Sequence, residues 1–144
     1  MAAVNCFKVR IVSQEESLFA GEAQKLFVSG VLGQLEVLYG HAPLLTKLQP
    51  GPVWVVPETG KEDILYVSGG ILEVQPTETI LLADVAIRAA DVDEVQALEA
   101  KKRAEQVIAT KGANFDYEKA HVQLTEALAK LRVLQKLKEY RDIR

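Results

Sequence analysis

Hydrophobic and polar residues alternate along the first part of the chain with the period of two that is typical of β-strands. Phe7, Val9 and Ile11 alternate with two basic residues, as expected when one face of a sheet is buried. Further short runs rich in Val, Ile, Leu or aromatic residues follow: KLFVSG, QLEVL, VWVV, DILYV, ILEVQ and TILLA. Gly and Pro separate these runs, so the pattern predicts an antiparallel β-sandwich, or flattened barrel, over residues 1–86. Gly69 and Gly70 are expected to form a hairpin turn with positive φ.

After Ala83 the spacing of apolar residues becomes helical, and a two-helix antiparallel hairpin is predicted over residues 87–144. The first helix is expected to open at Asp91, with Glu94 three residues later as in a capping box. One side of it carries mainly small residues, namely Ala97, Ala100, Ala104 and Ile108, and Lys111 and Gly112 would close it.

The second helix is expected to start near Asn114 or Asp116 and to run toward the C-terminus. Its predicted apolar stripe consists of Leu124, Leu128, Leu131, Leu134 and Leu137, backed by Ala120 and Ala127. Helices that meet through alanine bury little apolar area, so the hairpin would open and pack elsewhere at modest cost. A permanently docked hairpin is the alternative.

Composition and charge exclude several classes of protein. Hydrophobic residues make up 49% of the chain and charged residues 26%, as in soluble globular proteins. The net charge of −3 argues against general binding of nucleic acid. Cys6 is the single cysteine, so no internal disulfide can form. We expect neither a signal peptide nor a membrane-spanning segment, because no run of about 18 apolar residues occurs.

Motifs for catalysis are missing from the sequence. The two histidines, His41 and His121, lie far apart, and there is no HExxH, CxxC, GxSxG or phosphate-loop pattern. We interpret His41 as a loop residue whose ring bonds a nearby carbonyl group. A binding or mechanical role is therefore favoured over catalysis, and neither a metal nor a resident cofactor is expected.

Three segments, GHAPLLTKLQPG, YVSGGILEVQP and LADVAIRAADVDE, resemble in this order the epsilon subunit of bacterial F-type ATP synthase. The resemblance implies a non-catalytic rotor subunit whose sandwich packs on the gamma subunit and on the c ring. Its helices would fold onto the sandwich, or extend into the alpha and beta subunits of the catalytic head and inhibit ATP hydrolysis. Such a protein would lie on the cytoplasmic face of the bacterial plasma membrane, and would reach the membrane only through the complex.

Gln34, Glu36 and His41 correspond to the docking loops of the family. The family usually has Glu at position 34, Gly at position 36 and Pro at the position of Tyr39. Gln34 thus lacks the charge for an ionic contact, and Tyr39 lacks the fixed φ of proline.

The resemblance also implies that basic residues near the C-terminus contact the catalytic head in the inhibited state. Residues 130–144 carry six basic and two acidic side chains. The candidate contacts are Lys130, Arg132, Lys136 and Lys138, and the alternative is that they form a solvated helix face.

Some members of the family bind ATP on the hairpin through the pattern [IL]-D-x-x-R-A, to which VDEVQA corresponds here. Asp93 matches this pattern, but Gln96 stands in place of the arginine. Arg103 and Lys130 match further basic positions, whereas Glu126 replaces an arginine and would repel phosphates. The resemblance therefore predicts weak or absent ATP binding.

Two other functional hypotheses remain open from the sequence. One is a small-ligand module that holds a nucleotide between its helices. The other is a hydrolase hidden in the sandwich loops, although no nucleophile–base motif supports it.

Overall fold

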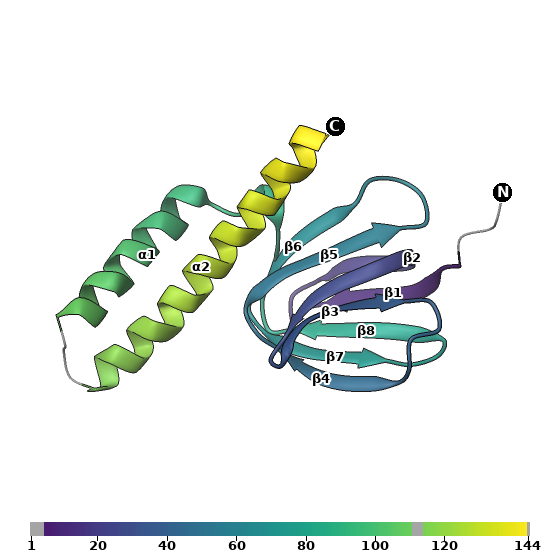
Figure 1. Ribbon diagram of the computed structural model, residues 1–144, viewed down its shortest axis with the longest axis horizontal. Coiled ribbons are helices and arrows are strands. Elements are labelled where there is room, and N and C mark those ends of the chain that lie inside the picture. Colours follow the sequence, from purple (N-terminus) through teal and green to yellow (C-terminus); the bar gives the residue numbers. More distant parts are fainter. Residues whose placement is uncertain (1–4, 111–113, 144) are drawn as a thin grey trace.

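The computed structural model describes residues 5–110 and 114–143, in which nine strands precede a short 3₁₀ helix and two α-helices (Figure 1). The strands are β1 Phe7–Val12, β2 Ser17–Gly30, β3 Gly33–Leu38, β4 Leu44–Leu48, β5 Gly51–Pro57, β6 Asp63–Val67, β7 Gly70–Val74, β8 Glu78–Ala83 and β9 Ala86–Arg88. The helices are η1 Ala89–Asp91, α1 Glu94–Ala109 and α2 Asn114–Ile143. The predicted sandwich followed by two helices is confirmed.

The strands form one sheet that closes on itself. Its order is β1-β8-β7-β4-β2-β5-β6-β9, with β3 beside β2, and β1 also pairs with β2. This last pairing closes the ring and produces the flattened barrel. The expectation of antiparallel pairing holds for the described strands except β1 and β8, which run parallel. The long connection between these two strands, which contains β2 to β7, permits that direction.

The alternating pattern places one face of each strand in a continuous core. Phe7, Val9 and Ile11 of β1 point inward, as predicted. Leu65 and Val67 of β6 join this core, while the neighbouring positions of the same strand point to the opposite face and are buried there as well. The main core contains no described residue from either α-helix.

Three strand segments were not among the runs predicted from the sequence. They are the first half of β2, the strand β4 and the strand β9. β4 has no simple alternation and stands between two prolines, and β9 has only three residues, so tertiary pairing rather than local pattern makes them strands. The expected domain boundary between residues 86 and 87 falls within β9. Arg88 fixes this strand to the sandwich by donating a hydrogen bond to the Leu18 carbonyl oxygen at 2.7 Å.

The prediction of a hairpin at Gly69 and Gly70 is wrong, although both residues have positive φ, 143° and 138°. The strands on either side do not pair with each other: β6 pairs with β5 and β9, and β7 pairs with β4 and β8. The two glycines instead connect β6, which pairs with β5, to β7, which pairs with β4 and β8. A Cβ atom at Gly70 would overlap the Leu82 carbonyl oxygen of β8.

Helix α1 starts at Glu94, so the expected start at Asp91 is also wrong. Asp91 belongs to η1, and Asp93 is the N-cap, whose side chain accepts a hydrogen bond from the Gln96 backbone N–H at 3.1 Å. The residue from which the sequence pattern would start the first turn of α1 instead belongs to the short 3₁₀ turn. The predicted closing residues Lys111 and Gly112 lie outside the described residues.

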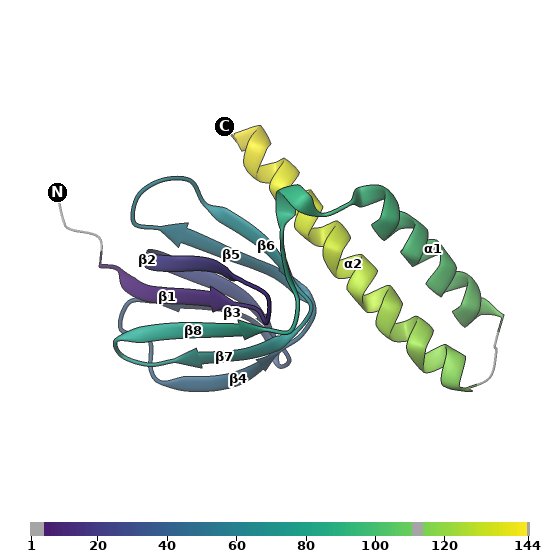
Figure 2. The same ribbon diagram turned by 180° about the vertical axis from the view of Figure 1, so that it is seen from behind.

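Helix α2 starts at Asn114, as expected. Its buried residues, however, do not form the single stripe of leucines that was predicted. Leu128 is 38% exposed, and the buried residues on α2 are smaller: Ala120, Ala127, Ala129 and Val133. The reason is that α2 has two partners. It packs against α1 on one side and against β5 and β6 on the other, so it lies between α1 and the sandwich (Figures 1 and 2). No helix among the described residues is long and apolar enough to cross a bilayer.

We predict that Gly70→Ala lowers the free energy of unfolding by roughly 2–4 kcal/mol, because a strained φ adds to the overlap with β8. Gly33→Ala is the matched control, since Gly33 also has a positive φ of 132° but a Cβ atom there would meet no other atom within 4 Å. It should cost about 1 kcal/mol. Urea unfolding followed by tryptophan fluorescence measures both, and equal losses would contradict the close approach of β8.

Candidate functional site

The turn between β2 and β3 projects from the sandwich and exposes apolar side chains. Leu32 is 98% exposed and Val31 is 50% exposed. Both lie in SGVLGQLEV, the segment that the resemblance assigns to docking, but neither was among the docking residues named from the sequence. Two large apolar residues between Gly30 and Gly33 are unusual in a turn, where polar residues dominate. An exposed apolar tip is a feature of surfaces that contact another protein.

Gln34 and Glu36 lie on the outer side of β3, next to this tip. Gln34 is opposite Ser29 in the register of β2 and β3, and both predicted docking residues are exposed. The Glu36 carboxylate lies 3.4 Å from the Lys25 ammonium group on β2. This exposed ion pair contributes little stability, so both charges are available to a partner.

His41 lies beyond the other end of β3, so the structure does not bring it together with Gln34. The six residues of β3 span about 20 Å. The His41 Nδ1 atom donates a hydrogen bond to the Ala42 carbonyl oxygen at 2.6 Å, because a carbonyl can only accept. The expectation that this ring bonds a nearby carbonyl is confirmed, and a docking role for His41 stays a prediction. Among the described residues, no three His, Cys, Asp or Glu side chains form a group that could hold a metal ion.

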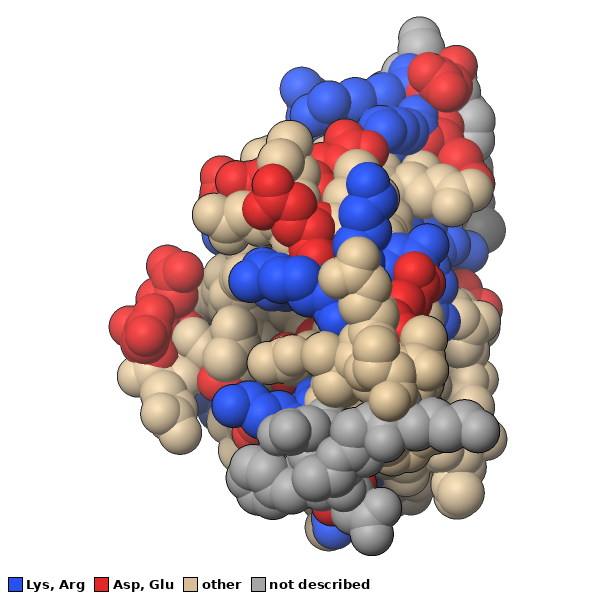
Figure 3. Space-filling view, turned by 90° about the vertical axis from the view of Figure 1, so that its left-hand side faces the viewer, with Lys and Arg blue, Asp and Glu red and all other residues tan. Residues whose placement is uncertain are grey.

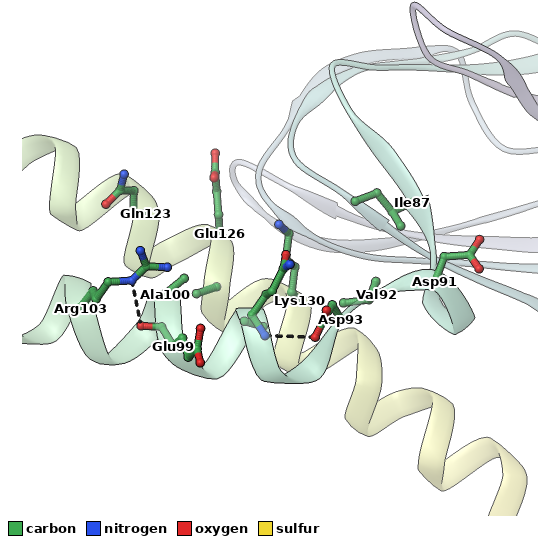
Figure 4. Close-up of a pocket in the computed structure, with 13 residues that line it drawn as sticks. Ile87, Asp91, Val92, Asp93, Glu99, Ala100, Arg103, Gln123, Glu126 and Lys130 are labelled. Carbon is green, nitrogen blue, oxygen red and sulfur yellow. Dashed lines mark hydrogen bonds between the residues drawn. The ribbon is translucent and has the colours of Figure 1, made fainter.

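A pocket of about 540 Å³ lies where α1, α2 and the segment after β9 meet (Figure 4). All five residues named for the nucleotide pattern line it: Asp93, Gln96, Arg103, Glu126 and Lys130. The hairpin thus brings together side chains from two helices that are well separated in the sequence.

The charge of this pocket is negative. Its lining residues include four carboxylates, from Asp91, Asp93, Glu99 and Glu126, and two cations, from Arg103 and Lys130. The carboxylate of Asp93 already caps α1, and Arg103 Nε donates to the Glu99 carbonyl oxygen at 3.5 Å. Oxygen acceptors therefore outnumber the donors that a phosphate group needs.

A second group of contacts joins α2 to the outer face of the sandwich. The Lys136 ammonium group lies 4.7 Å from the centre of the Trp54 ring and 5.3 Å from that of Phe27. The Lys130 ammonium group lies 5.3 Å from the centre of the Tyr66 ring. These distances are those of cation–π contacts. Burial, and to a lesser extent the negative charge of Glu126, raises the pKa of the Tyr66 hydroxyl group, so this ring stays neutral.

The aromatic residues of this interface were not identified from the sequence. Phe27 and Trp54 are direct partners in the register of β2 and β5, so their rings lie side by side on the outer face. Strand alternation does predict that both rings point away from the core, because the residues before and after Phe27, and those before and after Trp54, are buried in it. What the sequence could not show is that α2 covers them.

The four basic residues predicted to reach the catalytic head do not form one surface here. Lys130 and Lys136 contact the sandwich, Lys138 lies 3.2 Å from the Glu94 carboxylate of α1, and Arg132 is exposed. On the face of the molecule in Figure 3, acidic and basic side chains are mixed.

Comparison with known proteins agrees with this architecture. Residues 6–89 match the family described as ATP synthase, Delta/Epsilon chain, beta-sandwich domain, and residues 90–135 match its long alpha-helix domain. A curated relative, the ATP synthase epsilon chain of Chromohalobacter salexigens, is 49% identical over 133 residues, which cover 92% of this chain and 94% of the relative. The chain belongs to the ATP synthase epsilon-chain family.

Two solved structures of mitochondrial ATP synthases contain similarly folded chains. One lies in the mitochondrial ATP synthase of Euglena gracilis, in a structure of OSCP, F1 and the c-ring, with a TM-score of 0.72 and 18% identity over 94% of this chain and 81% of that one. Another lies in the central stalk and c-ring structure of the Tetrahymena thermophila enzyme, with a TM-score of 0.64 and 12% identity over 92% and 99% of the two chains. At these identities the likeness supports the fold alone.

We predict that Asp93→Ala speeds hydrogen exchange of the Gln96 amide about fivefold, because loss of an N-cap costs about 1 kcal/mol. Asp91→Ala removes the same charge two residues earlier, in η1, and should leave this amide unchanged. Exchange followed by NMR distinguishes the two variants. An equal effect of both would show that charge near the pocket, rather than the cap, stabilises the start of α1.

Proposed function

We propose that this epsilon-family chain is a non-catalytic rotor subunit of a bacterial proton-translocating F-type ATP synthase. In this proposal the sandwich couples the gamma subunit to the c ring, and the helices inhibit ATP hydrolysis when they extend between the alpha and beta subunits. The protein would work at the cytoplasmic face of the plasma membrane, attached through the complex.

The separation of the two hydrophobic clusters is the observation that carries this proposal. The main core lies wholly within the sandwich. The hairpin rests on a second, smaller cluster made by Ile64, Tyr66, Ala89, Ala129 and Val133. Movement of the helices would therefore open the small cluster and leave the folded sandwich intact, as a subunit with a fixed part and a moving part requires.

Exposed apolar residues on the sandwich support the proposed contacts with gamma and the c ring. Leu45, Ile71 and Leu82 lie on neighbouring strands β4, β7 and β8 and share one outer face. Leu32 projects from the β2–β3 tip. A broad apolar face would suit a stable contact with gamma, and a projecting tip would suit a smaller contact with the ring.

We further infer that ATP binds to the hairpin weakly or not at all. The interhelical pocket has a volume within the range of small-molecule sites. However, Gln96 supplies no charge for the phosphates, and Glu126 repels them. The alternative function, a module that binds a nucleotide between its helices, requires the opposite result.

Removal of the helices tests the inhibitory role. A chain that ends at Arg88 retains β9 and the complete main core. In the assembled ATP synthase we expect it to raise the rate of ATP hydrolysis by roughly two- to tenfold, as if half to nine-tenths of the enzyme were held inhibited. Pull-down with gamma should recover the truncated and the full chain equally. Unchanged hydrolysis with the truncated chain bound would rule out inhibition, and loss of gamma binding would rule out docking through the sandwich.

Calorimetric titration with ATP tests the nucleotide inference. The unaltered chain should show no micromolar affinity, whereas the double variant Gln96→Arg, Glu126→Arg should bind at least about tenfold more tightly, because it adds two cations and removes a carboxylate. The double variant Gln135→Arg, Glu139→Arg, on α2 outside the pocket lining, makes the same change in net charge and is the matched control. Micromolar binding to the unaltered chain would favour the nucleotide-binding module.

A further inference from the structure

The contact between α2 and the sandwich has a small apolar centre. Ala129 and Val133 are the buried α2 residues of this cluster, and they face Ile64 and Tyr66 of β6. Both are small side chains, so the apolar area that they remove from water is limited. Leu137 and Tyr140 pack at the edge and are only partly buried. Other contacts must therefore contribute a large share of the free energy that keeps the hairpin folded.

Two lysines flank this centre on the same face of α2. Lys130 and Lys136 stand three residues to either side of Val133, a spacing that keeps all three side chains toward the sheet. Each ammonium group lies over aromatic rings, while its aliphatic stem covers the apolar surface beside it. One continuous surface of α2 thus lies against β5 and β6, and it consists of Ala129, Lys130, Val133, Lys136, Leu137 and Tyr140.

The site around Lys136 is built from two strands. The Trp54 and Phe27 rings lie side by side, and the ammonium group is within 5.3 Å of both ring centres. Trp54 Nε1 donates a hydrogen bond to a Glu62 carboxylate oxygen at 2.7 Å, which fixes the orientation of the indole ring. Lys136, Trp54 and Phe27 are all half-buried. Cation–π contacts are stronger in such partly desolvated positions than at fully exposed ones.

We propose that Lys136 is a latch residue, whose ammonium group on the Trp54 and Phe27 rings holds α2 against the sandwich. Lys130 on Tyr66 is a second, parallel contact of the same kind. The latch belongs to the isolated chain and needs no partner. Its regulatory meaning rests on the proposed function: the cations that would contact the catalytic head are occupied while the hairpin is folded, so the two uses of Lys130 and Lys136 exclude each other.

Labelling of a buried thiol measures opening of this contact. Val133 is fully buried in the interface, so Val133→Cys in a Cys6→Ser background reacts with a thiol reagent only when α2 leaves the sandwich. Lys136→Met removes the charge and keeps an apolar stem, and it should speed labelling about three- to tenfold. Lys136→Arg keeps a cation and should stay close to the background rate. Lys102→Met, on the exposed side of α1, is the matched control and should not change the rate.

Global unfolding would also expose the thiol, so urea unfolding followed by far-UV circular dichroism accompanies each variant. The latch requires the labelling rate of Lys136→Met to rise more than its global unfolding constant. An unchanged rate, or a rise fully explained by global unfolding, would overturn the proposal.

A double-mutant cycle tests whether the aromatic rings are the partner of Lys136. In a Trp54→Leu background, Lys136→Met should add clearly less than it does when the indole ring is present. An undiminished effect would show that Lys136 acts through something other than the ring, and would reject the latch. If Trp54→Leu does not fold, Phe27→Leu replaces it in the same cycle.

The labelling test of the latch does not depend on the proposed function. Thiol labelling uses the chain alone, so a latch can be present even if helix removal leaves hydrolysis unchanged. Conversely, activation by helix removal together with unchanged labelling of Lys136→Met would retain the proposed function and reject the latch.

Discussion

The position of the whole C-terminal hairpin depends on one contact, that of α2 with the outer face of β5 and β6. Helix α1 lies on the far side of α2 from the sandwich (Figure 2), and its main packing partner is α2. The contact combines a small buried centre around Ala129 and Val133 with lysines that lie over aromatic rings. Because the buried area is small, a few side chains contribute a large share of the free energy of this contact.

The sandwich forms the opposite kind of structure. Its sheet closes on itself through the pairing of β1 with β2, and its core is complete without the helices. Strand β6 links the two parts, because its alternate side chains enter the main core and the interface with α2. Because the pairing of β1 with β2 closes the ring, few strand edges of this part stay unpaired. The chain therefore consists of a sandwich with its own core and a hairpin held on it by a smaller cluster, as the proposed function requires.

Lys130 connects the interface with the interhelical pocket. It lines the pocket and also lies over the Tyr66 ring. A phosphate group in the pocket would compete with the Tyr66 ring for the Lys130 ammonium group. The four carboxylates around the pocket leave few donors for an anion, so in this chain the contact with the sandwich is the better-supported use of Lys130.

The fold class follows from the order of residues alone, because periods of two and of 3.6 residues specify which side of each strand and helix is apolar. Five of the residues that line the pocket could also be named in advance, through the resemblance to the family's positions for ATP binding. The strands β4 and β9 could not be predicted, because their short segments become strands only by pairing with neighbouring strands. The connection from β6 to β7 at Gly69 and Gly70 could not be predicted either. Only the folded chain shows that α2 covers Phe27, Trp54 and Tyr66, because a contact between residues far apart in the sequence leaves no local periodicity. The same packing turned the expected leucine stripe into two narrower faces, since α2 must contact α1 and the sandwich at once.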